Sequence, residues 1–264
     1  MQTNYSPMVS VLMTAYNREK YISEAIESVL ASSYKCFELI VVDDGSTDAT
    51  VSIARSYAQK DDRVCVYVNE KNLGDYPNRN RAASYARGKY IKYLDSDDIM
   101  YAHCLDVMVS AMEKYPEAGF GLSSMGDAKK PYPVCISPAD TYQEHFANYG
   151  HFDRSPGSSI IRNEAFTQVK GFSGKRMIGD FEFWFKIARS FPMVKFPVDL
   201  YWSRQHEEQE SGSSYARSYN QLKEQVIKEA LSYETCPLSK EEKKSILLSL
   251  RKLKFKNKLS NLIR

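Results

Sequence analysis

Apolar runs that alternate with amphipathic segments constrain the fold of this chain more than any other feature. Four runs are short and apolar enough to be buried strands: residues 8–13, 37–42, 64–68 and 90–94. Between the first two runs, Ile22, Ile26 and Val29 recur at helical spacing, and similar patterns follow the later runs. Repeated alternation of strand and helix predicts an α/β fold, with a mostly parallel, Rossmann-like sheet flanked by helices.

The second half of the chain has a less regular pattern. Residues 126–156 contain four prolines and no clear periodicity, so we expect an irregular segment packed on the sheet. Residues 181–190 are predicted to be a helix and residues 200–202 a short strand. The polar residues 207–214 favour a loop, and two helices broken near Pro237 should complete the chain. We therefore predict a main domain over residues 1–212 and a helical extension over residues 213–264.

Composition excludes several classes of protein. With 264 residues, 43% of them hydrophobic, the chain can bury a full core. The five cysteines show no paired spacing, which argues against a disulfide framework or a zinc site and fits a reducing cytoplasm. No apolar stretch approaches the roughly 18 residues of a membrane span, and no export signal is apparent. We expect a cytoplasmic protein.

Positive charge is concentrated at the C-terminus. Residues 240–264 carry nine Lys or Arg against two Glu, whereas the whole chain has a formal net charge of only +3, so residues 1–239 are net acidic. An acidic body disfavours a nucleic-acid partner. The C-terminal stretch, with Leu250, Leu253, Leu259 and Leu262 among lysines, is consistent with peripheral contact at the inner face of an anionic membrane. Equally, it is consistent with a helix packed on the body or on a second subunit of a homodimer.

Polar side chains follow three of the predicted strands. The segments are Thr14 to Asn17, Asp43 to Ser46, and Asp95 to Asp98. In an open α/β sheet the ligand binds beyond the carboxyl ends of the strands, so these segments should meet at one crevice. Each alone is an ordinary turn or helix cap, and only the three together favour a binding site.

Asp95 and Asp97 are two residues apart at a strand end, where alternate side chains share a face. Mg²⁺ and Mn²⁺ are commonly held by one or two carboxylates together with substrate phosphates. Because no glycine-rich phosphate-binding sequence follows any strand, we expect a divalent metal to hold a diphosphate. Asp180, at the start of an aromatic-rich helix, is either a structural acid or a general base, and composition alone favours the structural role.

Five segments in this order resemble the inverting family-2 glycosyltransferases, which have the GT-A fold. They are Val9 to Asn17, Val42 to Asp48, Arg79-Asn80, Gly88 to Ile91, and Leu94 to Asp98. The resemblance covers about residues 7 to 210. Each motif is weak by itself, but the ordered set is specific. No Q-x-x-R-W segment, typical of processive members, is present, so the resemblance implies transfer of single sugars.

The resemblance implies roles for particular residues. Donor contacts would come from Thr14, Tyr16, Asp43, Asp44, Arg79, Asp95 and Arg204. Asp97 would ligate the metal, Mn²⁺ or Mg²⁺, with Asp95 and His206 as further contacts, although a lone histidine is more often a packing residue. Asp180 would be the catalytic base. The family usually has Glu before that Asp, whereas this chain has Gly179.

The implied activity is metal-dependent, inverting transfer of a sugar from a nucleotide diphosphate, UDP by resemblance, to an acceptor hydroxyl. The acceptor would be a carbohydrate or lipid-linked molecule in cell-surface polysaccharide or glycolipid assembly. Two alternatives remain: a nucleotidyltransferase that makes nucleotide sugars, and a non-catalytic module that binds them. The first would need a glycine-rich, basic loop after the first strand, where this chain has Thr14 to Arg18. The second would not require Asp180.

Overall fold

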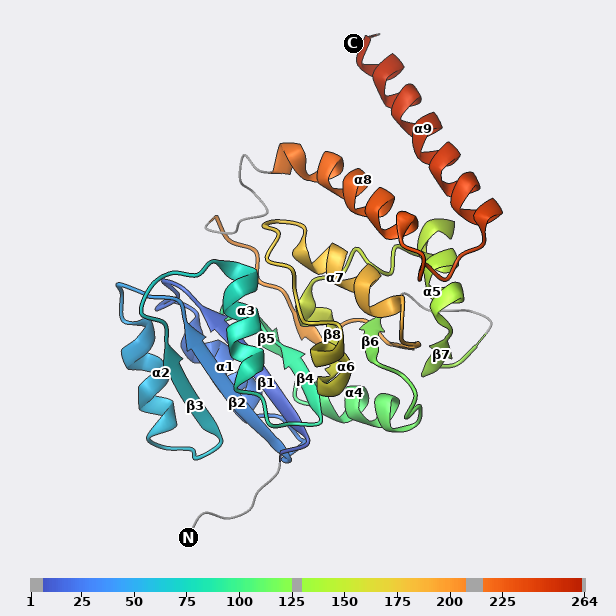
Figure 1. Ribbon diagram of the computed structural model, residues 1–264. Coiled ribbons are helices and arrows are strands. Elements are labelled where there is room, and N and C mark those ends of the chain that lie inside the picture. Colours follow the sequence, from blue (N-terminus) through green and yellow to red (C-terminus); the bar gives the residue numbers. More distant parts are fainter. Residues whose placement is uncertain (1–6, 125–129, 208–215, 263–264) are drawn as a thin grey trace.

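The structure, a computed structural model, describes residues 7–124, 130–207 and 216–262, and the main feature of these residues is an eight-stranded sheet (Figure 1). Its strands, in spatial order, are β3 (Val64–Val68), β2 (Phe37–Asp43), β1 (Val9–Ala15), β4 (Tyr90–Tyr93), β8 (Ser159–Arg162), β6 (Phe120–Ser123), β9 (Met193–Phe196) and β7 (Val134–Ile136). The first four strands run parallel, whereas β8 is antiparallel to both of its neighbours. The mostly parallel sheet is therefore confirmed, with antiparallel strands added in its second half.

Helices cover both faces of the sheet. The helices are α1 (Ile22–Leu30), α2 (Thr50–Ala58), α3 (Asp75–Ser84), α4 (Cys104–Glu113), α5 (Pro138–Glu144), α6 (Asn163–Gln168), α7 (Gly179–Ala188), α8 (Ala216–Ser232) and α9 (Lys240–Leu262). A small second sheet pairs β5 (Ile99–Met100) with β10 (Tyr201–Trp202). Along β1, Val11 and Met13 pack in the core under α1, α2 and α4, whereas Leu12 packs in the core under α3, α6 and α7. Two cores therefore lie on opposite faces of one sheet.

Residues 126–156 are more regular than the sequence pattern predicts. The expectation of an irregular segment is wrong for its described part, because β7 joins the edge of the sheet and α5 follows it. Two of the four prolines begin elements instead of interrupting them. Pro138 occupies the first turn of α5, which Ser137 caps, and Pro156 opens a short 3₁₀ turn. A proline in the first helical turn loses no hydrogen bond, because the amide there has no partner inside the helix.

The two C-terminal helices form as predicted, on either side of Pro237. Apolar residues of α8 are buried in the same core as α7, among them Val226, Ile227 and Leu231. On α9, Ile246 and Leu247 are partly buried against that core. Among the described residues, no helix combines the length and the apolar character needed to cross a membrane. The predicted domain boundary after residue 212 lies outside the described residues.

A close contact between backbones joins β1 to the turn before β4. Helix α3 ends at Ser84, before Gly88. The amide of Gly88 donates a hydrogen bond to Oγ of Ser10 at 2.8 Å. A Cβ at position 88 would lie 2.6 Å from the amide nitrogen of Ser10. Oγ of Ser10 in turn donates to the buried Glu38 at 2.6 Å. The absence of a side chain at Gly88 therefore lets β1 and β4 pair at this register.

We predict that Gly88→Ala destabilises the protein by about 1–3 kcal/mol, the usual cost of an added methyl group that a packed region cannot accept. The measurement is urea unfolding followed by circular dichroism. Ser84→Ala, on an exposed position just upstream, is the control and should change the free energy of unfolding little. Equal stability of the two variants would contradict the packing argument.

Candidate active site

A cleft of about 1140 Å³ opens at the carboxyl ends of β1, β2 and β4. It is lined by residues 14–21, 72–79 and 95–98, by Asp44, Thr47 and Asp48, and by Gly174, Arg176 and Ser203. The three polar strand ends therefore meet, as expected for a parallel sheet. The volume exceeds what a small drug-sized ligand fills, and it suits an extended polar ligand.

Asp43 and Asp44 follow β2 but occupy different environments. The Asp43 carboxylate accepts hydrogen bonds from the amides of Gly45 at 3.0 Å and Ser46 at 2.9 Å, and it does not line the cleft. The Asp44 carboxylate lines the cleft and accepts the amides of Leu73 at 2.8 Å and Gly74 at 2.9 Å. Asp43 thus holds the turn after β2. Asp44 ties the loop before α3 to the floor of the cleft.

The end of β1 supplies the first wall of the cleft. Thr14 and Tyr16 both line it, and Tyr16 is 47% exposed, so its ring is accessible from the cleft. Asn17 has a left-handed φ of 51° and joins this wall to the next, because its side-chain oxygen accepts the amide of Thr47 at 2.9 Å. Its own amide donates to Oγ of Ser46 at 2.8 Å. The first two strand ends are therefore fixed relative to each other.

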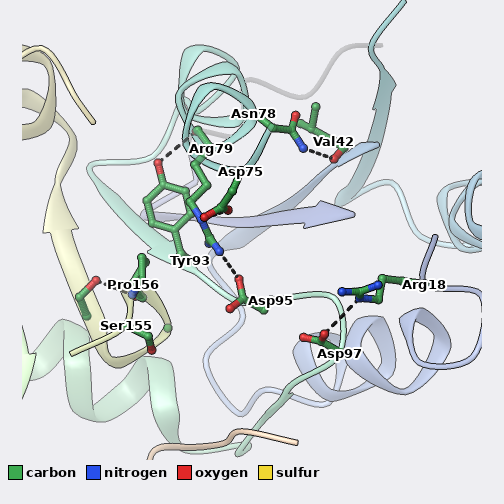
Figure 2. A network of polar contacts seen from close by, with 12 residues as sticks. Arg18, Val42, Asp75, Asn78, Arg79, Tyr93, Asp95, Asp97, Ser155 and Pro156 are labelled. Carbon is green, nitrogen blue, oxygen red and sulfur yellow. Dashed lines mark hydrogen bonds and ion pairs between the residues drawn. The ribbon is translucent and has the colours of Figure 1, made fainter. Parts of the chain in front are cut away.

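Arg79 of α3 fixes the third strand end (Figure 2). Its Nε donates to Asp75 at 2.7 Å, and one terminal nitrogen, Nη2, donates to Asp95 at 2.7 Å. The guanidinium also lies over the ring of Tyr93, 5.8 Å from its centroid. Its other terminal nitrogen, Nη1, is buried and has no hydrogen-bond partner among the described residues. Arg79 also lines the cleft, although this nitrogen itself is buried.

Asp97 is held by two nitrogen atoms. Its Oδ2 lies 3.1 Å from Nε of Arg18 and 3.0 Å from Nε2 of His206 (Figure 2 shows the contact with Arg18). The two ligands of an octahedral ion with bonds of about 2.1 Å are about 3 Å apart when adjacent. The spacing of Asp97 and His206 therefore fits a divalent cation, whereas Arg18 lies where it would compete for Asp97. Nδ1 of His206 is buried and has no partner among the described residues.

Arg204 connects the segment after β10 to the third strand end. Its amide donates to Oδ1 of Asp98 at 3.0 Å, and its Nε donates to the carbonyl oxygen of Asp97 at 2.9 Å. Its guanidinium also pairs with Glu24 at 2.6 Å. Neither Arg204 nor His206 lines the cleft directly, but both position its acidic end. Burial, followed by the charge of Asp95, raises the pKa of Asp98 to about 7.

Asp180 lies in the first turn of α7, behind the cleft. Burial raises the pKa of its carboxyl to about 6, although hydrogen bonds from the Phe181 amide and the Tyr76 side chain, together with the charge of Arg79, lower it. Tyr76 and Arg79 line the cleft and adjoin Asp180. A carboxylate with a pKa of about 6 is ionised at neutral pH and basic enough to accept a proton.

No group of three or more His, Cys, Asp or Glu side chains that could hold a metal occurs within the described part of the chain. A cation here would therefore have two protein ligands, Asp97 and His206, and would need the rest from a ligand such as a diphosphate. The residues fit that arrangement. Asp95, which the sequence pattern placed with Asp97, is instead paired with Arg79.

The cleft residues that were not singled out from the sequence include Arg18, Asp75 and Tyr76. Asp75 stands four residues before Arg79 on α3, and an acid–base pair at that spacing is visible in the sequence once the helix is assigned. Arg18 and Tyr76 have no such local pattern, because their partners Asp97 and Asp180 lie far along the chain. Residues 208–214, the greater part of the predicted loop, lie outside the described residues.

The chain matches the family model of glycosyl transferase family 2 over residues 10–170. A putative teichuronic acid biosynthesis glycosyltransferase, TuaG of Bacillus subtilis (strain 168), is 44% identical over 96 residues, which are 36% of this chain and 38% of that protein. That match therefore spans less than half of either protein.

Solved structures extend the likeness over most of the chain. TarS 1–349 of S. aureus in complex with UDP-GlcNAc has a TM-score of 0.72 at 23% identity, covering 90% of this chain and 70% of that one. The mannosyltransferase PcManGT from Pyrobaculum calidifontis, in complex with GDP-Man and Mn²⁺, has a TM-score of 0.64 at 20% identity, covering 89% of this chain and 67% of that one. At such identities the likeness concerns the fold, and the GT-A fold is confirmed.

We predict that Arg79→Met destabilises the protein by about 1–3 kcal/mol, because the carboxylates of Asp75 and Asp95 lose the cation between them. The cost stays moderate because both carboxylates are partly solvated. Guanidinium unfolding followed by tryptophan fluorescence measures the change. Arg81→Met, an exposed arginine on the same helix, is the matched control. If both variants unfold at the same denaturant concentration, the ion pairs of Arg79 do not hold the cleft together.

Proposed function

This chain belongs to glycosyl transferase family 2, and we propose that it moves a sugar from a nucleotide diphosphate to an acceptor hydroxyl with inversion of configuration. One observation carries the proposal. A carboxylate with a pKa of about 6, Asp180, adjoins the residues that line a cleft rich in acidic side chains at the ends of three parallel strands. That arrangement places a base beside a site suited to a cation-bound diphosphate.

The proposed reaction is a single displacement. Asp180 removes the proton from the acceptor hydroxyl as its oxygen forms a bond to the anomeric carbon of the donor sugar. The bond between that carbon and the diphosphate oxygen breaks, and the diphosphate leaves with the electron pair. Because the acceptor enters opposite the leaving group, the anomeric configuration inverts. Arg79, which lines the same cleft, would support the donor site through the ion pair that holds Asp95 in place.

The leaving diphosphate needs positive charge. Asp97 and His206 would hold Mn²⁺ or Mg²⁺, with Asp95 close by, and such an ion supplies electrostatic stabilisation of the leaving group. The protein itself contributes Arg18, whose guanidinium lies at Asp97 and lines the cleft. A cation at Asp97 would compete with Arg18 for this carboxylate, and the guanidinium would be available to the phosphates of a bound donor. The complex of PcManGT with Mn²⁺ supports metal use in this fold.

We propose UDP as the nucleotide. The exposed ring of Tyr16, beside Thr14 at the end of β1, offers a flat surface for a base, and Asp44 lines the same cleft. The complex of TarS with UDP-GlcNAc supports this choice. Asp43 contributes indirectly, because its carboxylate is used by the turn that carries Asp44.

The acceptor class that we propose is a carbohydrate or lipid-linked hydroxyl in cell-surface polysaccharide assembly, a role supported by the likeness to TuaG. Membrane contact through α9 and a homodimer remain predictions. Leu250 is partly buried against the body, so its side chain packs on the core and not on a membrane. The side chains of residues 253–264, which include Leu253, Leu259 and Leu262, lie outside those described.

Membership in the family favours transfer of a sugar over synthesis of a nucleotide sugar. The second alternative, a binding module without activity, differs from the proposed enzyme in the role of Asp180. Such a module would keep the cleft and its nucleotide affinity without using a base.

We predict that Asp180→Asn lowers kcat by about two to four orders of magnitude while nucleotide affinity changes little, because amide nitrogen and oxygen do not accept a proton at neutral pH. Product formation with UDP-sugars, and UDP binding by calorimetry, measure the two effects. In the unaltered enzyme kcat/KM should fall as pH drops through about 6, since burial raises the pKa of Asp180 and protonation removes the base. Unchanged turnover in the variant would eliminate the proposed mechanism.

We predict that Arg18→Ala increases the affinity for Mn²⁺ in the absence of nucleotide by about fivefold, because Asp97 loses a competing cation. Electron paramagnetic resonance of free Mn²⁺ measures the affinity without requiring turnover. Arg55→Ala, an exposed arginine on α2, is the control, and Asp97→Asn should abolish the binding. Weaker Mn²⁺ binding in Arg18→Ala would contradict the competition.

A further inference from the structure

Residues 202–206, which follow the start of β10, lie against the first turn of α1. The guanidinium of Arg204 pairs with Glu24 of that helix at 2.6 Å. The same guanidinium lies 5.2 Å from the ring centroid of Tyr21 and 5.0 Å from that of Trp202. The beginning of α1 and the segment that carries Arg204 and His206 are therefore in contact, although they lie far apart in the chain.

The imidazole of His206 is placed at Asp97 without a hydrogen bond on its other side. Its Nε2 lies 3.0 Å from Oδ2 of Asp97, and the side chain is only 8% exposed. A histidine that binds a metal normally donates its second ring nitrogen to a carboxylate, a carbonyl or a water, which fixes the orientation of the ring. Nδ1 of His206 is buried and has no such partner within the part of the chain that the structure describes. Among these residues, the orientation of the ring therefore depends on packing.

Tyr21 supplies that packing. The ring centroids of Tyr21 and His206 are 4.8 Å apart, with the planes inclined by 35°. This separation lies within the range in which aromatic rings attract each other. Tyr21 is partly buried and lines the cleft. One side chain thus contacts both Arg204 and His206, the two residues of this segment to which the sequence pattern assigned a role.

The backbone of Tyr21 is itself held in place. Its amide donates to the carbonyl oxygen of Arg18 at 3.0 Å, and its carbonyl oxygen accepts the amide of Ala25 at 3.2 Å. The amide of Arg18 donates to Oγ1 of Thr50 at 2.7 Å, which ties the turn before α1 to the start of α2. The same turn therefore provides Arg18, whose side chain reaches Asp97, and Tyr21, whose ring contacts the other partner of Asp97.

We propose that Tyr21 is a positioning residue that holds the imidazole of His206 beside Asp97 and so prepares the two protein groups that a divalent cation would use. This inference rests on the cation site of the proposed function. Tyr21 acts through the ring of His206 and supplies no ligand of its own. Mg²⁺ in particular accepts little departure from octahedral geometry, so an imidazole that is free to rotate away from Asp97 would bind it less well.

The first test examines the imidazole in the absence of metal. NMR carbon relaxation of the His206 ring, assigned with His206→Ala, should report a rigid ring in the unaltered protein and in Tyr21→Phe, and a mobile ring in Tyr21→Ala. Tyr34→Ala, which removes another partly buried tyrosine beyond the opposite end of α1, is the matched control and should leave the ring rigid. An imidazole as rigid in Tyr21→Ala as in the unaltered protein overturns the inference.

The second test measures Mn²⁺ affinity by electron paramagnetic resonance of the free ion. Tyr21→Ala should weaken Mn²⁺ binding by about tenfold, the effect expected when the support of a metal-binding histidine is lost. Tyr21→Phe and Tyr34→Ala should bind Mn²⁺ as the unaltered protein does. Because Tyr21 acts through His206, the double variant Tyr21→Ala/His206→Ala should bind no more weakly than His206→Ala alone. Additive losses would show that Tyr21 acts by another route, and would overturn the inference.

The outcomes separate this inference from the proposed function. If neither Asp97→Asn nor His206→Ala weakens Mn²⁺ binding, the cation site of the proposed function is overturned, and the role of Tyr21 in it falls as well. If His206→Ala weakens the binding and Tyr21→Ala does not, the cation site stands and the role of Tyr21 is overturned.

Discussion

The ion pairs of Arg79 are the interaction on which the rest of the site depends. Parallel strands bring acidic residues to one edge of the sheet, where their charges repel one another. A buried guanidinium between Asp75 and Asp95 offsets that repulsion and joins α3 to the end of β4. Arg18 acts similarly on Asp97, at the other end of the cleft. The protein thus stabilises a cleft with acidic walls by supplying its own cations.

Burial divides the acidic residues into groups with different properties. Asp98 and Asp180 are buried enough for their pKa values to rise to about 7 and about 6, respectively. Asp97 remains near the solvent of the cleft, paired with a histidine and an arginine. The proposed transfer reaction would need such a separation, because one group would accept a proton while another would hold a cation. Here that separation follows from the depth at which each strand or helix places its acid.

Most of the fold was predictable because its determinants are local. Apolar runs specify β1 to β4 by composition alone, and helical spacing specifies α1 and α7. β7 was missed because a strand of three residues has no periodicity to detect, and it forms only through pairing with β9. Cleft residues within the ordered motifs, such as Tyr16, Asp44 and Asp97, were likewise predictable, because parallel strand ends must meet.

The sequence by itself determined the parallel half of the sheet, the meeting of three polar strand ends and the family, since these follow from periodicity and from motifs in order. Only the tertiary structure decided what each acidic residue does. Asp43 and Asp44 are neighbours in the chain, yet one holds a turn and the other lines the cleft, because successive side chains at a strand end point apart. The ring of Tyr21 packs against His206, the partner of Asp97, a contact between distant segments that no local pattern encodes.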